Sequence, residues 1–279
     1  MNYRIIIDSC GEQLKEWKDD DRFEQASLTL EVNGTVIIDD KTFDQDRFLK
    51  LVAASPVCPK SSCPSPERYL DSFRSSAEHH YAVTLSAELS GSYNSAVLGK
   101  NLYRDEGGKA DVYVFNSRSA SVGETLIAMK IAECEEKGLS FQEVVRTVED
   151  YIEEQQTLFV LENLETLRKN GRLSNIKAFV ASALNIKPLM GSTPEGSIQQ
   201  IAQTRGMKKA MAYLVSYLQL EITDKEKKIL GIAHCNCQAR AEHLRDVIAG
   251  EMNFRDIIIV DTAGVSSMYA NDGGIIVVA

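Results

Sequence analysis

Short apolar runs alternate along the chain with segments in which apolar residues recur every three or four positions. The short runs are rich in isoleucine and valine and are bounded by glycine, aspartate, asparagine or serine, which is typical of buried β-strands. They predict strands at 4–7, 26–32, 35–39, 81–85, 111–115, 157–160, 198–202, 228–234, 256–260 and 274–278. The three- and four-residue spacing predicts helices at 44–53, 66–77, 93–103, 123–137, 141–155, 161–169, 176–183, 208–219 and 238–249.

Signals at several helix ends support these boundaries. Ser65 followed by Pro66 fits an N-cap with proline in the first turn. Ser140 and Glu143 fit a capping box, and Gly138 fits the position just past the end of the preceding helix.

The order of these elements predicts two α/β regions. Strands and helices alternate across residues 81–155, which predicts a parallel sheet covered by helices. The stretch "SLTLEVNGTVIID" places Asn33-Gly34 between two β-rich runs, a strong hairpin signal. The second half mixes helices with strands that need not be parallel. We therefore expect one domain at 1–155 and another at 156–279, with an approximate boundary and possible exchange of segments.

Composition and charge narrow the function classes. The chain has 279 residues, 44% of them apolar and 25% charged, which fits one folded protein of two domains. A net charge of −9 argues against general binding to nucleic acid and against docking on an anionic membrane. No apolar run is long enough to span a membrane, and "MNYRIIIDSC" becomes polar too early for a signal peptide. We therefore expect a cytoplasmic protein.

The sequence contains no recognisable catalytic or metal motif. The six cysteines are expected to be reduced thiols, and "HCNC" at 234–237 lacks the second ligand pair that a zinc site needs. None of the four histidines stands in a triad-like context, and there is no G-x-S-x-G elbow or phosphate-binding glycine loop. A nucleophile and a base can still meet in the folded chain, so an enzyme remains an alternative.

Three hydroxyl-rich segments stand at predicted helix starts: "SSCPSP" at 61–66, "SAELSGSYNSA" at 86–96 and "NSRSASVGE" at 116–124. The second and third follow predicted strands directly, and loops at the carboxyl ends of parallel strands form the ligand crevice of such sheets. Helix N-termini offer free N–H groups and a partial positive charge there. The pattern predicts a site for a carboxylate or a phosphate, although serine and asparagine also cap ordinary helices.

Six segments in order resemble the DegV family of bacterial lipid-binding proteins over nearly the whole chain. "IIIDSCGEQL" resembles the family's opening strand, "SSCPSP" its Thr-Ser-x-Pro-Ser loop, and "TLSAELSGSYNSA" and "VFNSRSASVGE" its next two serine-rich segments. "LENLETLRKNGRLS" and "LNIKPLM" resemble a Gly-Gly-Arg-Ile-Ser segment and a Lys-Pro run of its second half.

The resemblance implies an α/β/α domain with a largely parallel sheet and a second α/β domain with a mixed or antiparallel sheet. It implies a long-chain fatty acid buried between them, no other cofactor or metal, and a carboxylate held by hydroxyl groups. The matching positions are Ser61, Ser62, Ser90, Gly91 and Ser92. It also implies a carrier without catalysis that presents its ligand to a fatty-acid kinase, with Arg172 and Arg205 near basic positions that serve the partner or the acyl phosphate.

The chain departs from the family's pattern at three places. Ser61 replaces the loop threonine, which keeps a hydroxyl, and Asn116-Ser117 replaces Asp-Ser, which removes a charge. "YANDGG" replaces His-Thr-Gly-Pro-Gly, so that Ala270 stands where the histidine belongs and Tyr269 is left to supply its hydrogen bond. The missing histidine leaves a divergent protein-interaction module as one alternative to the carrier. Serines near an arginine leave another, a serine-dependent hydrolase or transferase of acyl or phosphoryl esters.

Overall fold

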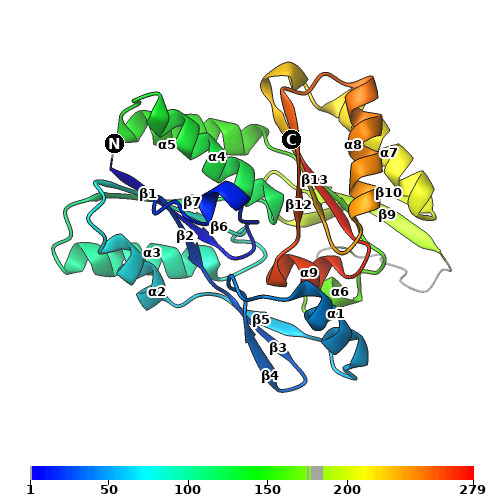
Figure 1. Cartoon of the computed structure of the whole chain (residues 1–279), viewed down its shortest axis with the longest axis horizontal. Coiled ribbons are helices and arrows are strands. Elements are labelled where there is room, and N and C mark those ends of the chain that lie inside the picture. The colour runs from blue at the N-terminus through cyan, green and yellow to red at the C-terminus, as the bar shows by residue number, and fades with distance from the viewer. Residues whose placement is uncertain (1, 175, 177–184) are drawn as a thin grey trace.

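The computed structural model describes residues 2–174, 176 and 185–279. Within these residues the strands form three sheets, and helices pack on the two larger ones (Figure 1). The helix predicted at 176–183 lies, apart from residue 176, outside the described residues. No helix in the described part of the chain is long and apolar enough to cross a membrane.

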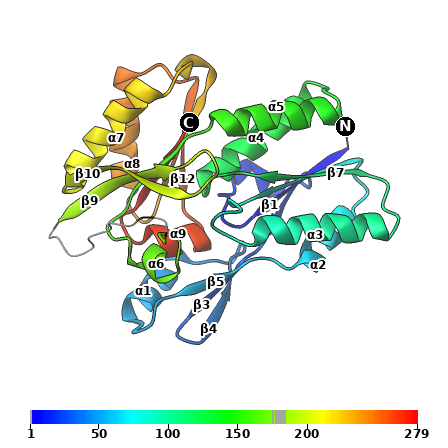
Figure 2. The same cartoon turned by 180° about the vertical axis from the view of Figure 1, so that it is seen from behind.

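The first sheet is parallel throughout and has the strand order β2-β1-β6-β7. Helices α2 and α3 cover one of its faces and α4 and α5 cover the other (Figures 1 and 2). The elements of this layer are β1 (Tyr3–Asp8), the short 3-10 helix η1 (Lys15–Trp17), β2 (Phe23–Ala26), α2 (Pro66–Phe73), β6 (His79–Thr84), α3 (Ser92–Asp105), β7 (Asp111–Asn116), α4 (Val122–Glu136) and α5 (Phe141–Glu154). The predicted parallel sheet between helices is confirmed.

The helix ends in this layer have the predicted local chemistry. The Ser65 hydroxyl accepts a hydrogen bond from the Arg68 N–H at 3.3 Å and caps α2. Ser140 and Glu143 form the capping box of α5. Gly138 has φ +76° just after α4, a left-handed conformation that glycine adopts without steric cost.

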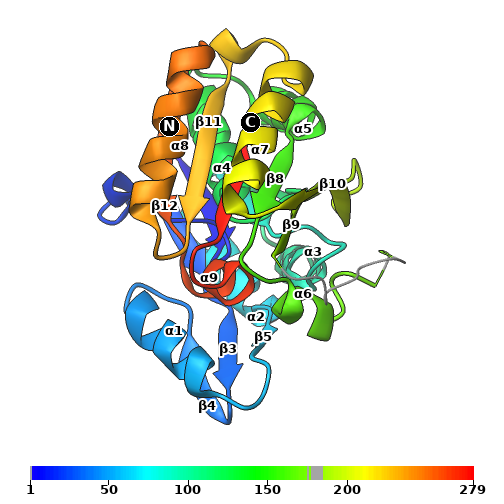
Figure 3. The ribbon, with the colours of Figure 1, turned by 90° about the vertical axis from the view of Figure 1, so that its right-hand side faces the viewer.

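A small antiparallel sheet, in the order β4-β3-β5, projects from the body of the protein together with α1 (Figures 1 and 3). Its elements are β3 (Thr29–Val32), β4 (Thr35–Ile38), α1 (Gln45–Ala54) and β5 (Lys60–Ser62). Asn33 and Gly34 have φ +48° and +79°, as a two-residue type I′ hairpin requires, so the predicted hairpin is confirmed.

One prediction in this region was wrong, and one strand was missed. The run at 26–32 was predicted as one strand, but it is shared between two sheets. The Ser9 hydroxyl accepts the Leu28 N–H at 2.9 Å, and Ala26 ends β2 before the chain crosses to β3. β5 was missed because its sequence, Lys-Ser-Ser, carries no apolar residue. It is a strand only because it pairs with β3.

The third sheet has the order β10-β9-β8-β13-β11-β12, and every neighbouring pair is antiparallel except β11 and β12. Helices α7 and α8 cover one face (Figure 3). Its elements are β8 (Thr157–Val160), α6 (Glu165–Lys169), β9 (Ile186–Ser192), β10 (Ile198–Arg205), α7 (Met207–Glu221), the 3-10 helix η2 (Lys225–Lys227), β11 (Ile229–His234), α8 (Gln238–Glu251), β12 (Asp256–Asp261), α9 (Gly264–Ala270) and β13 (Ile275–Val278). The predicted mixed sheet is confirmed.

The helix predicted at 161–169 is shorter than expected, since α6 begins only at Glu165. Leu161, Leu164 and Leu167 have helical spacing, but the first two lie in an irregular segment and bury against the same apolar cluster as the third. Strand β9 and helix α9 were not predicted.

The first and third sheets meet through α4. Val122 and Leu126 of α4 pack against Ala233 and Val278 of the third sheet. A side chain at Gly231 would lie 2.5 Å from Val122, so glycine allows this close approach. The strands before residue 155 build the first two sheets and those after it build the third, while the boundary near Gln155 itself stays a prediction.

Candidate functional site

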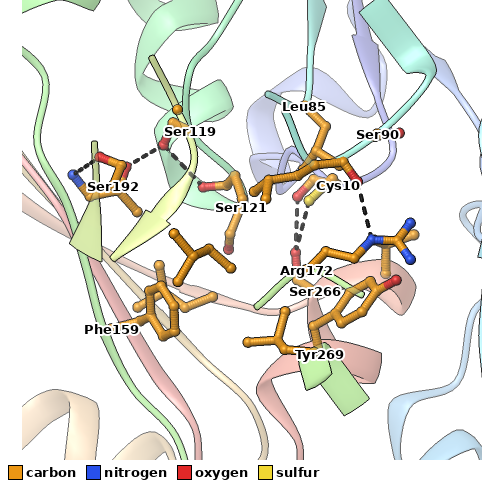
Figure 4. A pocket seen from close by; sticks show the side chains of 18 of the residues that line it. Cys10, Leu85, Ser90, Ser119, Ser121, Phe159, Arg172, Ser192, Ser266 and Tyr269 are labelled. Atoms are coloured by element: carbon orange, nitrogen blue, oxygen red, sulfur yellow. Dashed lines mark hydrogen bonds between the residues drawn. The ribbon is translucent and has the colours of Figure 1, made fainter. Parts of the chain in front are cut away.

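A narrow cavity lies where the three sheets come together (Figure 4). It encloses about 830 Å³ of atom-free space, the open space at its entrance included, and the surface that faces it is almost entirely apolar. The apolar residues around it are Cys10, Leu28, Leu85, Leu89, Ala120, Phe159, Leu161, Leu167, Ile198, Val265, Ala270 and Ile276.

One end of the cavity carries hydroxyl groups and a cation, and we call it the Arg172 end. The Ser61 and Tyr269 hydroxyls lie 3.3 Å apart, and the Arg172 guanidinium carbon lies 5.6 Å from the centre of the Tyr269 ring. Arg172 donates hydrogen bonds to the backbone carbonyls of Leu89 at 3.2 Å and Asn170 at 2.6 Å. Among the described residues no carboxylate forms an ion pair with Arg172.

Tyr269 keeps its proton at neutral pH. Burial raises the pKa of Tyr269, although the Ser61 hydrogen bond and the Arg172 charge act to lower it. A protonated hydroxyl beside an arginine can donate to a carboxylate oxygen.

The start of α3 adds to the Arg172 end. Ser90 lines the cavity, and its hydroxyl accepts the Ser92 N–H at 3.2 Å. Gly91, the N-cap residue of α3, has no side chain to cap the helix, and the Ser90 hydroxyl takes one of the free N–H groups of the first turn instead. The remaining N–H groups leave partial positive charge at this helix start.

The opposite end of the cavity, near Ser119 and Ser192, also carries hydroxyl groups, but they bind each other (Figure 4). The Ser119 and Thr157 hydroxyls lie 2.5 Å apart, and the Ser192 hydroxyl accepts the Thr157 N–H at 3.4 Å. The Ser121 hydroxyl donates to Glu12 at 2.8 Å. Arg118, next to Ser119 in the chain, also lines the cavity. The Arg172 end differs because Ser61, Tyr269 and Arg172 lie together there.

Of the nine positions predicted as site residues, five line the cavity. They are Ser61, Ser90, Arg172, Tyr269 and Ala270. They come from four separate parts of the chain, and the fold brings them to one wall and one end of the cavity.

Four predicted positions do not line it. Ser62 follows Ser61 in a strand, where neighbouring side chains point to opposite faces, and it is exposed. Ser92 is buried beneath Ser90 with their hydroxyls 3.3 Å apart, and Gly91 has no side chain to contribute. Arg205 is exposed at the end of β10, where it pairs with Ile186.

Several cavity residues were not singled out from the sequence. Ser119 and Ser121 belong to the hydroxyl-rich segment after β7, so a signal existed for them. The sequence gives no such signal for Phe159, Ser192 and Ile198, because the face of a strand that lines a cavity depends on how the sheet packs.

None of the four histidines is among the described residues that line the cavity. In the part of the chain that the structure describes, no group of three or more histidine, cysteine, aspartate or glutamate residues is placed to hold a metal ion. Cys237 of the "HCNC" segment donates instead to the Gly274 carbonyl.

Two buried carboxyl groups stand behind the cavity wall. Glu12 accepts the Ala263 N–H at 2.7 Å, and Asp39 accepts the N–H groups of Gly264 and Val265 at 2.7 and 2.8 Å. Burial raises the pKa of Glu12 to about 8 and that of Asp39 to about 6. At neutral pH, Glu12 is therefore mostly protonated and Asp39 mostly ionised.

The raised pKa of Glu12 makes stability depend on pH. Between its ordinary pKa of about 4.5 and about 8, folded Glu12 holds a proton that the unfolded chain has released, so its contribution to stability falls as pH rises through this window. Glutamine has no proton to lose. As the pH increases, we expect the unfolding free energy of Glu12→Gln to rise relative to that of wild type, by at most about 1.4 kcal/mol per pH unit. Urea titrations at pH 5.5, 7 and 8.5 measure this difference.

The exposed Glu16→Gln is the matched control and should track wild type at each pH. A difference between Glu12→Gln and wild type that stays constant across the three pH values would contradict the assignment.

Comparison with known proteins gives one consistent relationship. The model of a family described as "Uncharacterised protein, DegV family" matches residues 2–279. A DegV domain-containing protein of Streptococcus pneumoniae is 33% identical over 278 residues, covering 99% of this chain and 98% of the relative.

Two solved structures are similar to this fold over their whole length. A DegV family protein of Ruminococcus gnavus, with vaccenic acid, is 55% identical with a TM-score of 0.97, covering 100% of this chain and 99% of the other. The Streptococcus pneumoniae Fatty Acid Kinase (Fak) B3 protein loaded with linoleic acid is 32% identical with a TM-score of 0.91, again covering 100% and 99%.

Proposed function

Because this chain belongs to the DegV family, we propose that its cavity binds one long-chain fatty acid, with the carboxylate at the Arg172 end. The observation that carries the proposal is the cavity itself. It is an apolar space with Ser61, Tyr269 and Arg172 together at one end.

The two parts of the ligand have different tasks in this proposal. Burying each methylene group is worth about 0.8 kcal/mol, so a long tail supplies most of the affinity. Hydrogen bonds to a charged carboxylate contribute about 1.5–3 kcal/mol each and fix the orientation. Tyr269 takes the place of the histidine that Ala270 replaces, since its hydroxyl already contacts Ser61.

The relatives with solved structures support a carrier. Their ligands are vaccenic acid and linoleic acid, and one of the two is a fatty-acid kinase B protein by name. We infer that this chain likewise presents its bound acid to a fatty-acid kinase and supplies no catalysis. The partner then acts on a carboxylate that lies at the end of the cavity, beside the positive charge of Arg172.

A serine hydrolase is the weaker alternative. Ser61 contacts a tyrosine and Ser90 contacts Ser92, and neither has a histidine base beside it. We expect no labelling of either serine by a fluorophosphonate probe. An interaction module with a vestigial pocket is also weaker, because the cavity is still open and lined with apolar residues.

Mass spectrometry of organic extracts tests the proposal. We expect purified protein to carry long-chain fatty acid in stoichiometric amount, or to take it up after removal of lipid. A delipidated protein that binds no acid of any chain length would refute the carrier function.

A further inference from the structure

Helix α9 forms a wall of the cavity and is anchored at both ends. It is contributed by the second half of the chain and directs Ser266 and Tyr269 toward the cavity (Figure 4). Ser266 also donates a hydrogen bond to the Cys10 carbonyl at 3.0 Å. Any shift of α9 would therefore move the Tyr269 hydroxyl relative to Ser61.

The first turn of α9 is hydrogen-bonded to Asp39. One carboxylate oxygen of Asp39 accepts the Gly264 N–H at 2.7 Å, and the other accepts the Val265 N–H at 2.8 Å and the Ser9 hydroxyl at 2.9 Å. A side chain at Gly264 would lie 2.5 Å from Asp39, so glycine permits this approach. A buried, ionised carboxylate on the N-terminal amides also complements the helix dipole.

The last turn of α9 meets the same small sheet through Tyr269 and Ser61. Asp39 directly follows β4, and its N–H donates to the Leu28 carbonyl at 3.0 Å. Ser61 lies in β5 and is paired with Leu30 of β3. Asp39, just after β4, thus holds the start of α9, and Ser61 of β5 contacts its last turn. Figure 3 shows α9 next to the small sheet.

We propose that Asp39 is a positioning residue for head-group recognition: by fixing the first turn of α9, it sets the Tyr269 hydroxyl beside Ser61, where the fatty-acid carboxylate binds. The inference rests on the proposed function. It requires that weakening the hydrogen bonds between Asp39 and α9 reduces the affinity for a carboxylate. This effect must depend on Tyr269 and must leave the binding of the tail nearly unchanged.

Asp39→Asn isolates this role. Asparagine keeps the size of the side chain, but its amide nitrogen cannot accept an N–H, so one of the two α9 amides loses its partner. Tyr269→Phe removes the hydroxyl that Asp39 is proposed to place. If the two residues act on the same hydrogen bond, the effect of Asp39→Asn disappears in the Tyr269→Phe background, as a double-mutant cycle measures.

The experiment titrates delipidated wild type, both single variants and the double variant with oleic acid and with methyl oleate, which has the same tail without a charged head. We expect Asp39→Asn to weaken oleic acid about tenfold, as for a lost hydrogen bond to a charged group, and methyl oleate by less than about threefold. Asp40→Asn is the control and should bind both ligands as wild type does, because the Asp40 carboxylate accepts from the N–H and the hydroxyl of its near neighbour Thr42, at 2.8 and 2.6 Å.

Equal losses for the two ligands, or additive losses with Tyr269→Phe, would overturn the inference and leave Asp39 a purely structural residue. If Asp39→Asn does not fold, the milder Ser9→Ala removes one donor to Asp39. It should weaken oleic acid more than methyl oleate as well, but by a smaller factor. Wild type that fails to bind oleic acid would refute the proposed function instead, so the two failures are distinguishable.

Discussion

Replacing Ile276 with tryptophan is expected to weaken binding of long-chain fatty acids by roughly 100-fold or more. Ile276 lies in β13 opposite Phe159 of β8, and both line the cavity. The larger side chain would block the path of the tail beside Phe159 and keep about four methylene groups out of the cavity, at about 0.8 kcal/mol each, or about 3 kcal/mol in all. Titration of delipidated protein with acids of increasing length measures the loss, which should shrink for chains short enough to stop before Ile276.

Val36→Trp is the matched control, because Val36 is 64% exposed on the small sheet and is not among the residues that line the cavity. It should bind every chain length as wild type does. Equal affinity of Ile276→Trp and wild type for a long-chain acid would mean that the tail does not occupy this cavity.

Removing the charge at the end of the cavity is expected to give the second largest effect. Arg172→Ala should weaken a long-chain acid by roughly 10- to 150-fold, the cost of losing hydrogen bonds and charge at a carboxylate of about 1.5–3 kcal/mol. The methyl ester of the same acid should lose little, since it carries no charge. The backbone contacts of Arg172 to Leu89 and Asn170 also disappear, so thermal unfolding must be compared alongside.

Arg168→Ala provides the control for charge. Arg168 is an exposed arginine of α6 that pairs with Glu165 at 2.8 Å, and it does not line the cavity. Its loss changes the net charge by the same amount and should leave affinity within about twofold, since an exposed ion pair is worth little. Equal losses from Arg168→Ala and Arg172→Ala would show that general electrostatics, and not a specific contact, attract the acid.

Much of the fold was predictable because local signals dominate it. Asn33-Gly34 determines its hairpin by backbone conformation alone, and Ser140 with Glu143 starts α5 by satisfying its own first amides. Strand β9 escaped prediction because Lys187 and Pro188 interrupt its apolar pattern. It is held as a strand by β8 and β10 on its two sides.

The site was predictable in chemistry more than in geometry. The hydroxyl-rich segments indicated an anion site, but nothing in "SSC" tells whether Ser61 or Ser62 faces inward, since the pairing of β5 with β3 decides it. Helix α9 is only seven residues long and depends on Asp39, which is 225 positions away from Gly264 in the chain. Contacts of that range leave no periodic pattern in the sequence.

The relatives' lipids and the cavity lead to one claim about orientation, and a crystal structure of this protein loaded with oleic acid tests it most directly. The account predicts the acyl tail along Phe159 and Ile276, with the carboxylate within hydrogen-bonding distance of the Ser61 and Tyr269 hydroxyls and next to Arg172. A carboxylate found at the opposite end beside Ser119 and Ser192, or oleic acid bound outside the cavity, would contradict it.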